Sequence, residues 1–294
     1  MTTTAWVFPG QGSQKIGMQG DLVKNPAALA KLEKAEEILK WSILEVCEKD
    51  EEKLSRTRYT QPCLYAIEAI LVDLLLEAGQ TPQYLAGHSL GEYVALYAAG
   101  VYDFEAGLRL VKRRGELMDE AEGGKMYALM GFDRDQLQGE INRTPNVVLA
   151  NDNSAGQVVI SGEPKAVDTI VAAVKTKRAI ELNVSGAFHS HFMKSASEQF
   201  NEILATVEFN EAKIPVLSNV EPIPTTNAGE LKTRLQQQMT GSVRWREIMD
   251  AIAANKVEQI VEVGPGKVLA GLFKRAYSKL PRLNVDSMAA LPKG

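Results

Sequence analysis

The 294-residue sequence contains little cysteine and little histidine, with two cysteines and three histidines in all. Cys47 and Cys63 lack the close spacing of a metal-binding motif, and two cysteines cannot form the framework of a disulfide-rich secreted domain. This usage is typical of a reducing compartment, so we expect the protein to be cytoplasmic. The scarcity of histidine confines the search for a general base to His88, His189 and His191.

The sequence also lacks an excess of positive charge and a long apolar run. It has 37 acidic and 33 basic residues, a net charge of −4 and no polybasic segment, so we expect no nucleic-acid partner. No apolar segment reaches the length of a membrane span, and residues 1–4 do not begin a signal peptide, so we expect no membrane association. The composition, 45% hydrophobic and 24% charged, is that of a globular chain.

A serine between two glycines stands out in residues 87–92, which read GHSLGE. Residues 83–86 before it predict a short buried strand, and residues 92–99 after it predict a helix that ends at a glycine. This is the pattern of a nucleophile elbow, in which a tight turn exposes the hydroxyl of Ser89 and directs the N–H of Leu90 toward the same point. The alternative is a loop that only connects a strand to a helix.

Among the three histidines, His189 is the best placed to serve as a base for Ser89. It follows apolar residues in a segment rich in small residues, which we interpret as a crossing between two domains, and such crossings often border clefts. We rank His191 second, at the start of a predicted helix over 192–204. His88 ranks third, because its side chain should diverge from that of Ser89 in a sharp turn. The alternative for each is a helix-capping or surface histidine.

Arg114 lies on the apolar side of a predicted helix over 104–118 when its residues are projected at about 100° each. Lys112 and Arg113 fall outside this apolar arc. A buried guanidinium cannot lose its charge, so it needs an anionic partner. That partner is either an Asp or Glu in a structural ion pair, or a substrate carboxylate held by two parallel hydrogen bonds. The residue pattern leaves these alternatives equal.

Two glutamines lie beside predicted elements. Gln11 is in a glycine-rich loop after a predicted strand over 5–8, where α/β sheets place ligands, but the loop matches neither a phosphate-binding nor a dinucleotide-binding pattern. Gln61 precedes Pro62 and a predicted helix over 63–78, and we interpret it as a cap of that helix rather than a site residue.

The order of the predicted elements indicates an α/β fold with a mostly parallel sheet, because strands and helices alternate around the elbow. Residues 125–184 instead give strand, helix, strand, strand, helix and strand, the order of the ferredoxin-like split unit. We therefore predict a small domain inserted between two pieces of a larger one. The remaining core elements predicted are strands over 214–219 and 259–263 and helices over 27–49, 229–239, 244–254 and 267–276.

Seven separated motifs carry a resemblance to a known family. In chain order they are VFPGQGSQ, TQP, GHSLGEY, RG-x-LM, NSAGQVVISG, AFHS and EVGPGKVL. In these motifs the sequence resembles the malonyl-CoA:acyl-carrier-protein transacylases, an acyltransferase family of fatty-acid and polyketide synthesis. The resemblance implies an α/β-hydrolase-like large subdomain with a mostly parallel sheet, residues 1–124 and 190–294, and an inserted ferredoxin-like small subdomain, residues 125–189.

The resemblance also implies a role for each matching residue. Ser89 matches the family's nucleophile, His189 its general base and Arg114 the arginine that binds the malonyl carboxylate. The other matching positions are Gln11 and Leu90 (backbone N–H groups of the oxyanion hole), Gln238 (a backbone carbonyl that orients the histidine), Phe188 (malonyl-selective members) and Asn153 and Gln61 (pocket lining). Gly241 and Ser242 are less typical of the family, which weakens the match of Gln238.

The reaction implied is transfer of a malonyl group from malonyl-CoA to the phosphopantetheine thiol of acyl carrier protein, through a malonyl ester on the serine. The coenzyme A thioester is a substrate, and we expect no cofactor and no metal. We also expect a monomer. Carrier proteins of this kind are acidic, and the candidate docking residues are Lys175, Lys177, Arg178, Lys267, Lys274 and Arg275, for which a solvated basic face is the alternative.

Three other functions remain open at this point. A serine esterase or thioesterase would share the elbow but would need an acidic residue behind the histidine, and we find no convincing one. A malonyltransferase of a polyketide assembly line would differ only in its carrier protein. A scaffold that binds carrier protein without catalysis would not need Ser89, His189 and Arg114 together.

Overall fold

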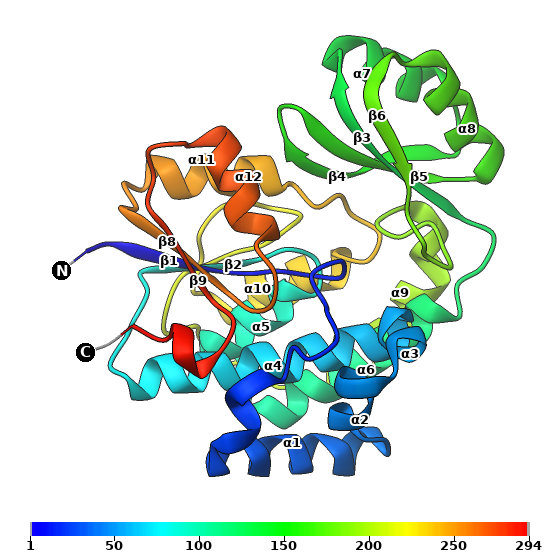
Figure 1. Cartoon of the computed structure of the whole chain (residues 1–294). Coiled ribbons are helices and arrows are strands. Elements are labelled where there is room, and N and C mark those ends of the chain that lie inside the picture. The colour runs from blue at the N-terminus through cyan, green and yellow to red at the C-terminus, as the bar shows by residue number, and fades with distance from the viewer. Residues whose placement is uncertain (1, 293–294) are drawn as a thin grey trace.

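The computed structural model describes residues 2–292, which form two β-sheets of different kinds (Figure 1). The larger sheet has five parallel strands in the order β7-β2-β1-β8-β9. These strands are β1 (Thr4–Phe8), β2 (Tyr84–Gly87), β7 (Val216–Leu217), β8 (Gln259–Val263) and β9 (Arg282–Val285). The chain therefore has the predicted α/β fold with a parallel sheet.

Helices cover both faces of the parallel sheet, and the alternation of side chains along β1 determines which helices each face meets. Trp6 and Phe8 share a core with the helices below the sheet in Figure 1, whereas Ala5 and Val7 share a core with those above it. A sheet covered on both faces needs consecutive apolar residues, which explains the uninterrupted apolar run of β1. The lower helices include α1 (Pro26–Leu39), α2 (Ile43–Lys49), α3 (Glu51–Ser55), α4 (Thr57–Glu77), α5 (Gly91–Ala98), α6 (Phe104–Asp119) and α9 (Lys194–Thr206), and the upper ones are α11 (Trp245–Ala254) and α12 (Val268–Ala276).

The register of the two central strands places two loops together. Phe8 at the end of β1 pairs with Gly87 at the end of β2, and the N–H of His88 donates to the carbonyl of Phe8 at 2.9 Å. The loop after β1 and the turn after β2 therefore leave the sheet at the same edge. This is the carboxyl edge of a parallel sheet, where such folds bind their ligands.

The smaller sheet has four antiparallel strands in the order β4-β5-β3-β6 and lies at the upper right of Figure 1. Its elements are β3 (Lys125–Phe132), α7 (Arg134–Arg143), β4 (Val147–Ser154), β5 (Gln157–Gly162), α8 (Pro164–Ala173) and β6 (Thr176–Glu181). It has an apolar core of its own, shared with α7 and α8. Strand β4 extends to Ser154, because two register shifts keep residues 151–154 paired with β5.

Backbone hydrogen bonds connect the two sheet units near the end of β4. The N–H of Val243 donates to the carbonyl of Ala150 at 2.8 Å, and the N–H of Asp152 donates to the carbonyl of Val243 at 2.9 Å. The buried carboxylate of Asp152 also pairs with Arg134 at 2.9 Å and with Arg246 at 3.0 Å. The small unit is thus attached beside the segment that follows α10 (Ala228–Gln237).

Helix α4 corrects two expectations. It begins at Thr57 and continues through Pro62, so Gln61 lies inside the helix and is not a cap. Proline removes one backbone donor but keeps a helical φ, and the burial of α4 from both sides offsets that loss. The helix also has the length and composition of a membrane span, 21 residues with a mean hydropathy of 1.3, contrary to our expectation. However, 83% of that window is buried inside the protein, as in a central core helix.

Glu68 is a fully buried residue of α4 whose two carboxyl oxygens have no hydrogen-bond partner among residues 2–292. Burial raises the pKa of Glu68 well above its ordinary value of 4.5, and the neighbouring Glu262 raises it further. The folded protein therefore keeps a proton that the unfolded chain releases. It follows that stability is lost as the pH rises above about 4.5.

We predict that Glu68→Met raises the free energy of unfolding at pH 7 by about 1–3 kcal/mol, because it removes a buried polar group without a partner. The gain should shrink as the pH falls below 4.5, where the carboxyl of Glu68 is protonated in the folded and the unfolded state alike. Urea denaturation between about pH 7 and pH 4 measures the free energy of unfolding of the variant and of the parent protein. Glu202→Met, at an exposed position of α9, is the control. A gain that does not change with pH would contradict the prediction.

Candidate active site

Ser89 occupies a tight turn between β2 and α5. Its backbone φ is +53°, in the left-handed region that non-glycine residues rarely adopt. The flanking glycines are required by space: a Cβ on Gly87 would lie 1.8 Å from the carbonyl carbon of Gly91, and one on Gly91 would lie 2.1 Å from the carbonyl oxygen of Phe8. The elbow therefore fits against the end of β1 only with glycine at both positions.

The imidazole of His189 is in direct contact with the hydroxyl of Ser89. The distance from Ser89 Oγ to His189 Nε2 is 2.8 Å, and the ring nitrogen Nδ1 faces the carbonyl oxygens of Gln238 at 3.0 Å and Gly241 at 3.2 Å. Because two carbonyls can only accept, Nδ1 carries the proton and Nε2 is free to accept the one on Ser89. Burial, and next the charge of Arg114, lower the pKa of His189 to about 3, so the ring is neutral at neutral pH.

The guanidinium of Arg114 contacts the same hydroxyl. Its Nη2 donates to Ser89 Oγ at 3.0 Å and to Gln238 Oε1 at 3.1 Å, and its Nη1 donates to Gln61 Oε1 at 2.7 Å. The side chain is 1% exposed, and it lies over the ring of Tyr93 at 5.3 Å. No carboxylate among residues 2–292 lies within ion-pair distance of it. Among the described residues, the geometry therefore gives no structural ion pair for Arg114, which was the first of its two alternatives.

These side chains border a small cavity of about 90 Å³ between the two sheet units. Gln11, Leu90 and Phe188 also line it, and the N–H groups of Gln11 and Leu90 have no hydrogen-bond partner among the described residues. Two free N–H groups beside the hydroxyl of Ser89 are the arrangement that stabilises an oxyanion. The remaining lining residues are Gln61, His88, Met118, Met126, Asn151, Leu182 and Val184.

Three candidate residues do not have the surroundings that the sequence suggested: a pocket residue (Asn153), a second-ranked base (His191) and a helix cap (Gln61). Asn153, expected to line the pocket, does not border the cavity and instead contacts His88 Nε2 through its Oδ1 at 2.8 Å. His191 is exposed and stacks on Phe192, with ring centroids 4.3 Å apart, away from Ser89. Gln61, interpreted as a cap, reaches Arg114. Of the three histidines, only His189 contacts the hydroxyl of Ser89.

Sequence reasoning missed two buried residues that hold the elbow, Asn219 and Glu92. The side chain of Asn219 accepts from the N–H of Ser89 at 2.7 Å, and its backbone N–H donates to Glu92 Oε2 at 3.1 Å. Asn219 lies just beyond β7, which ends at Leu217 and is shorter than the predicted 214–219. An asparagine directly after an apolar strand was the available signal, because that strand ends at the same edge as β2.

Proteins of similar sequence are acyltransferases, which agrees with the geometry of the site. The acyl transferase domain family matches residues 5–293. The malonyl CoA-acyl carrier protein transacylase of Synechocystis sp. is 56% identical over 288 residues, which are 98% of this chain and 97% of that protein. The polyketide biosynthesis malonyl CoA-acyl carrier protein transacylase PksC of Bacillus subtilis is 40% identical over 92% of this chain and 96% of its own length.

Solved structures give the same result. The crystal structure of the Synechocystis malonyl-CoA:ACP transacylase matches with a TM-score of 0.97 and 55% identity, over 98% of this chain and 99% of that one. A malonyl-transacylase in complex with its type II polyketide synthase acyl-carrier protein matches with a TM-score of 0.93 and 38% identity, over 98% and 97% of the two chains. The chain therefore belongs to the acyl transferase family and, within it, to the malonyl-CoA:acyl-carrier-protein transacylases.

Proposed function

We propose that the protein transfers the malonyl group of malonyl-CoA to the phosphopantetheine thiol of acyl carrier protein, through a malonyl ester on Ser89, and so supplies fatty-acid synthesis. The observation that carries this proposal is that one hydroxyl oxygen, Ser89 Oγ, contacts both His189 Nε2 at 2.8 Å and Arg114 Nη2 at 3.0 Å. A base and a carboxylate-binding cation thus meet at a single nucleophile.

In the first half-reaction, His189 takes the proton of Ser89 while the hydroxyl oxygen attacks the thioester carbonyl. The N–H groups of Gln11 and Leu90 hold the oxyanion that develops. The carbon–sulfur bond then breaks, and coenzyme A leaves as a thiol with the proton from His189. In the second half-reaction His189 takes the proton of the carrier thiol while its sulfur attacks the ester carbonyl on Ser89. The ester C–O bond then breaks, and Ser89 Oγ recovers the proton from His189. One thioester is exchanged for another, so the chemistry requires neither an energy source nor a metal.

Arg114 selects an acyl group that carries a carboxylate. Its guanidinium has hydrogen bonds to two neutral amides and a hydroxyl but no carboxylate contact, so its charge is available to the malonyl group. The charge of Arg114 is also the second cause that lowers the pKa of His189. A bound malonyl carboxylate neutralises this charge and raises the basicity of the imidazole. The substrate with the carboxylate thereby strengthens the base that activates Ser89.

Two rival functions are less well supported. A serine esterase or thioesterase usually has an acidic residue behind its histidine, whereas His189 Nδ1 faces two backbone carbonyls. A malonyltransferase of polyketide synthesis keeps some support, because polyketide transacylases are among the relatives. It differs from the proposed function only in the carrier protein.

At the level of subdomains, we propose an α/β-hydrolase-like large subdomain, residues 1–124 and 190–294, and a ferredoxin-like small subdomain, residues 125–189. The strand order β4-β5-β3-β6 and the separate core of that sheet support the small subdomain. The elbow after β2 at the carboxyl edge of a parallel sheet supports the large one. Both cysteines are free and buried, which fits a cytoplasmic location. The monomeric state stays a prediction.

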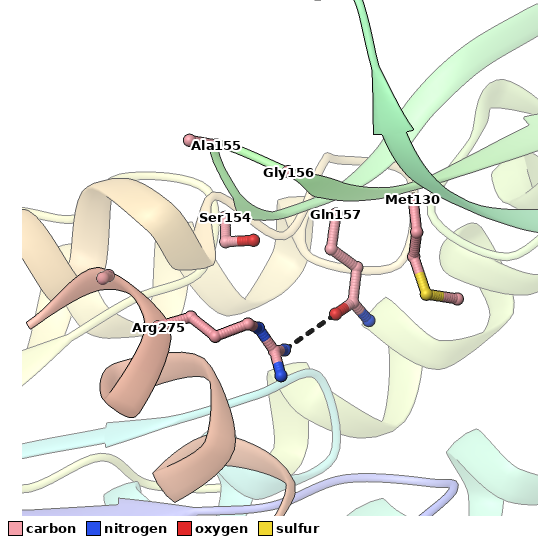
Figure 2. A pocket seen from close by; sticks show the side chains of 7 residues that line it. Met130, Ser154, Ala155, Gly156, Gln157 and Arg275 are labelled. Atoms are coloured by element: carbon pink, nitrogen blue, oxygen red, sulfur yellow. Dashed lines mark hydrogen bonds between the residues drawn. The ribbon is translucent and has the colours of Figure 1, made fainter. Parts of the chain in front are cut away.

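We also propose that carrier protein docks on a basic surface formed by Lys175, Lys177, Arg178, Lys267, Lys274 and Arg275. All six side chains are exposed, and none forms an ion pair with another described residue. A groove of about 400 Å³ lies between α12 and the β4–β5 turn, and Figure 2 shows Arg275 reaching across it to Gln157 at 2.9 Å. Exposed cations without ion-pair partners, one of which lines a groove, suit an acidic partner.

Ser89→Ala should leave no covalent malonyl adduct after incubation with malonyl-CoA, because the attacking oxygen is absent. Intact-protein mass spectrometry measures the adduct. Ser161→Ala, which removes a different buried hydroxyl in β5, should keep the full yield of adduct. An undiminished adduct in Ser89→Ala would refute the proposed function.

Arg114→Ala should reduce kcat/KM for malonyl transfer by an amount equivalent to about 2–5 kcal/mol, because the malonyl carboxylate loses its charged partner. Acetyl transfer, which has no carboxylate to bind, should fall much less. Parallel steady-state kinetics with the two thioesters test this, with the neighbouring Arg113→Ala as the control. An equal loss for both acyl groups would mean that Arg114 has only a structural role.

Charge reversal of the docking surface should affect only the second half-reaction. We expect Lys274→Glu combined with Arg275→Glu to reduce the rate of transfer to carrier protein at low salt by roughly tenfold, because electrostatic steering is lost. The rate of Ser89 acylation by malonyl-CoA should not change. Lys24→Glu combined with Lys49→Glu, on the α1–α2 side of the molecule (Figure 1), is the matched control. If both pairs slow transfer equally, the docking surface lies elsewhere.

A further inference from the structure

Both main-chain polar groups of Ser89 are bound by amide side chains from other parts of the chain. The N–H of Ser89 donates to Asn219 Oδ1 at 2.7 Å, and Gln238 Nε2 donates to the carbonyl of Ser89 at 2.9 Å. Asn219 Nδ2 also donates to the carbonyl of Gly87 at 2.6 Å. A non-glycine residue in the left-handed region is strained and persists only where its surroundings fix it. These two amides are what fixes the backbone of Ser89.

The two residues that bind Ser89 meet at a single oxygen atom of Glu92. Glu92 Oε2 accepts from Gln238 Nε2 at 2.7 Å and from the backbone N–H of Asn219 at 3.1 Å. Glu92 lies in the first turn of α5 and is fully buried. Burial raises the pKa of Glu92, and the hydrogen bonds from Gln238 and Asn219 oppose that rise. A carboxyl group in this position contributes chiefly as an acceptor for both neighbours.

The carboxyl of Glu92 decides which way the amide of Gln238 points. Only the NH₂ end of the amide can face an acceptor oxygen, so Nε2 lies toward Glu92 and the carbonyl of Ser89. The other end, Oε1, consequently faces the guanidinium of Arg114 at 3.1 Å. The reversed amide would set an oxygen against the carboxyl and a donor against the guanidinium. Glu92 thus fixes the acceptor that Arg114 needs.

Glu92 acts on Arg114 without touching it. Gln238 lies between them, and Arg114 has no ion-pair partner among the described residues. A carboxylate in direct contact would occupy the guanidinium that the malonyl carboxylate must bind under the proposed function. An acid one amide away orients that amide and leaves the face of the guanidinium toward the cavity free.

We propose that Glu92 is a positioning residue of the transfer reaction: through Gln238 it sets the guanidinium of Arg114, and through Gln238 and Asn219 it sets the main chain of Ser89. This role rests on the proposed function, because it concerns the binding of a carboxylate-bearing acyl group. Glu92 touches neither the acyl group nor the reacting oxygen.

The test compares malonyl and acetyl acylation of Ser89 in three variants. Glu92→Met keeps the volume but removes the acceptor, and it should lower the malonyl-to-acetyl ratio of acylation rate constants by about tenfold. A displaced Arg114 changes the surroundings of Ser89 and His189 for both acyl groups, but only the malonyl group also loses the partner of its carboxylate. Glu92→Gln can keep its oxygen at the Oε2 position and should restore most of the ratio. Glu68→Met, which replaces a buried glutamate without these hydrogen bonds, should leave the ratio unchanged.

The outcomes separate this role from the proposed function. If the parent protein acquires no malonyl group from malonyl-CoA, the proposed function is refuted and this role with it. If the parent is acylated but Glu92→Met keeps the parent's ratio, only the role of Glu92 is refuted. If Glu92→Gln has the same low malonyl-to-acetyl ratio as Glu92→Met, the role of Glu92 is also refuted. The hydrogen bonds to the Oε2 position would then not account for the change in the ratio.

A second variant covers the case in which Glu92→Met does not fold. Gln238→Met removes the amide but keeps the backbone carbonyl that faces His189 Nδ1. The malonyl-to-acetyl ratio should fall by the same roughly tenfold factor, because Arg114 loses the same acceptor. An unchanged ratio in Gln238→Met would overturn the proposed role of Glu92.

Discussion

The buried positive charge of Arg114 is the constraint on which the rest of the site depends. A guanidinium cannot be neutralised by losing its proton, and burying it without a contacting carboxylate is costly. The protein offsets part of this cost with the amide oxygens of Gln61 and Gln238, the ring of Tyr93 and the more distant carboxyl of Glu92. None of these groups is a carboxylate in contact with the guanidinium. Under the proposed function, the malonyl carboxylate supplies that missing contact.

The parallel sheet brings the parts of this site together. Strands β1 and β2 end in register, so the loop with Gln11 and the elbow with Ser89 share one edge. Asn219 follows β7 at the same edge, and Arg114 and Gln61 extend toward it from α6 and α4. His189 has a φ of +56° and is, like Ser89, held in the left-handed region by contacts on both sides. The position of the Ser89 hydroxyl therefore depends on tertiary contacts that restrain two unfavourable backbone conformations.

Much of the architecture could be predicted from the sequence because it rests on local patterns. The apolar runs of β1 and β8, the glycines around Ser89 and the position of Arg114 on an apolar arc are all visible in short windows. What escaped prediction depends on side-chain direction across distant segments. Gln61 resembles a cap because of Pro62, yet α4 starts a turn earlier. Asn219 and Glu92 are ordinary polar residues in sequence, and only the packing of β7 against β2 brings Asn219 into contact with both Ser89 and Glu92.

The backbone hydrogen bonds between Val243 and the end of β4 fasten the small unit along one margin of the cavity. Gly241, whose carbonyl faces His189, lies two residues from that margin. The same short segment therefore attaches the small unit and supplies a carbonyl that holds the proton on His189 Nδ1. The tautomer of the imidazole and the placement of the small unit consequently depend on one stretch of main chain.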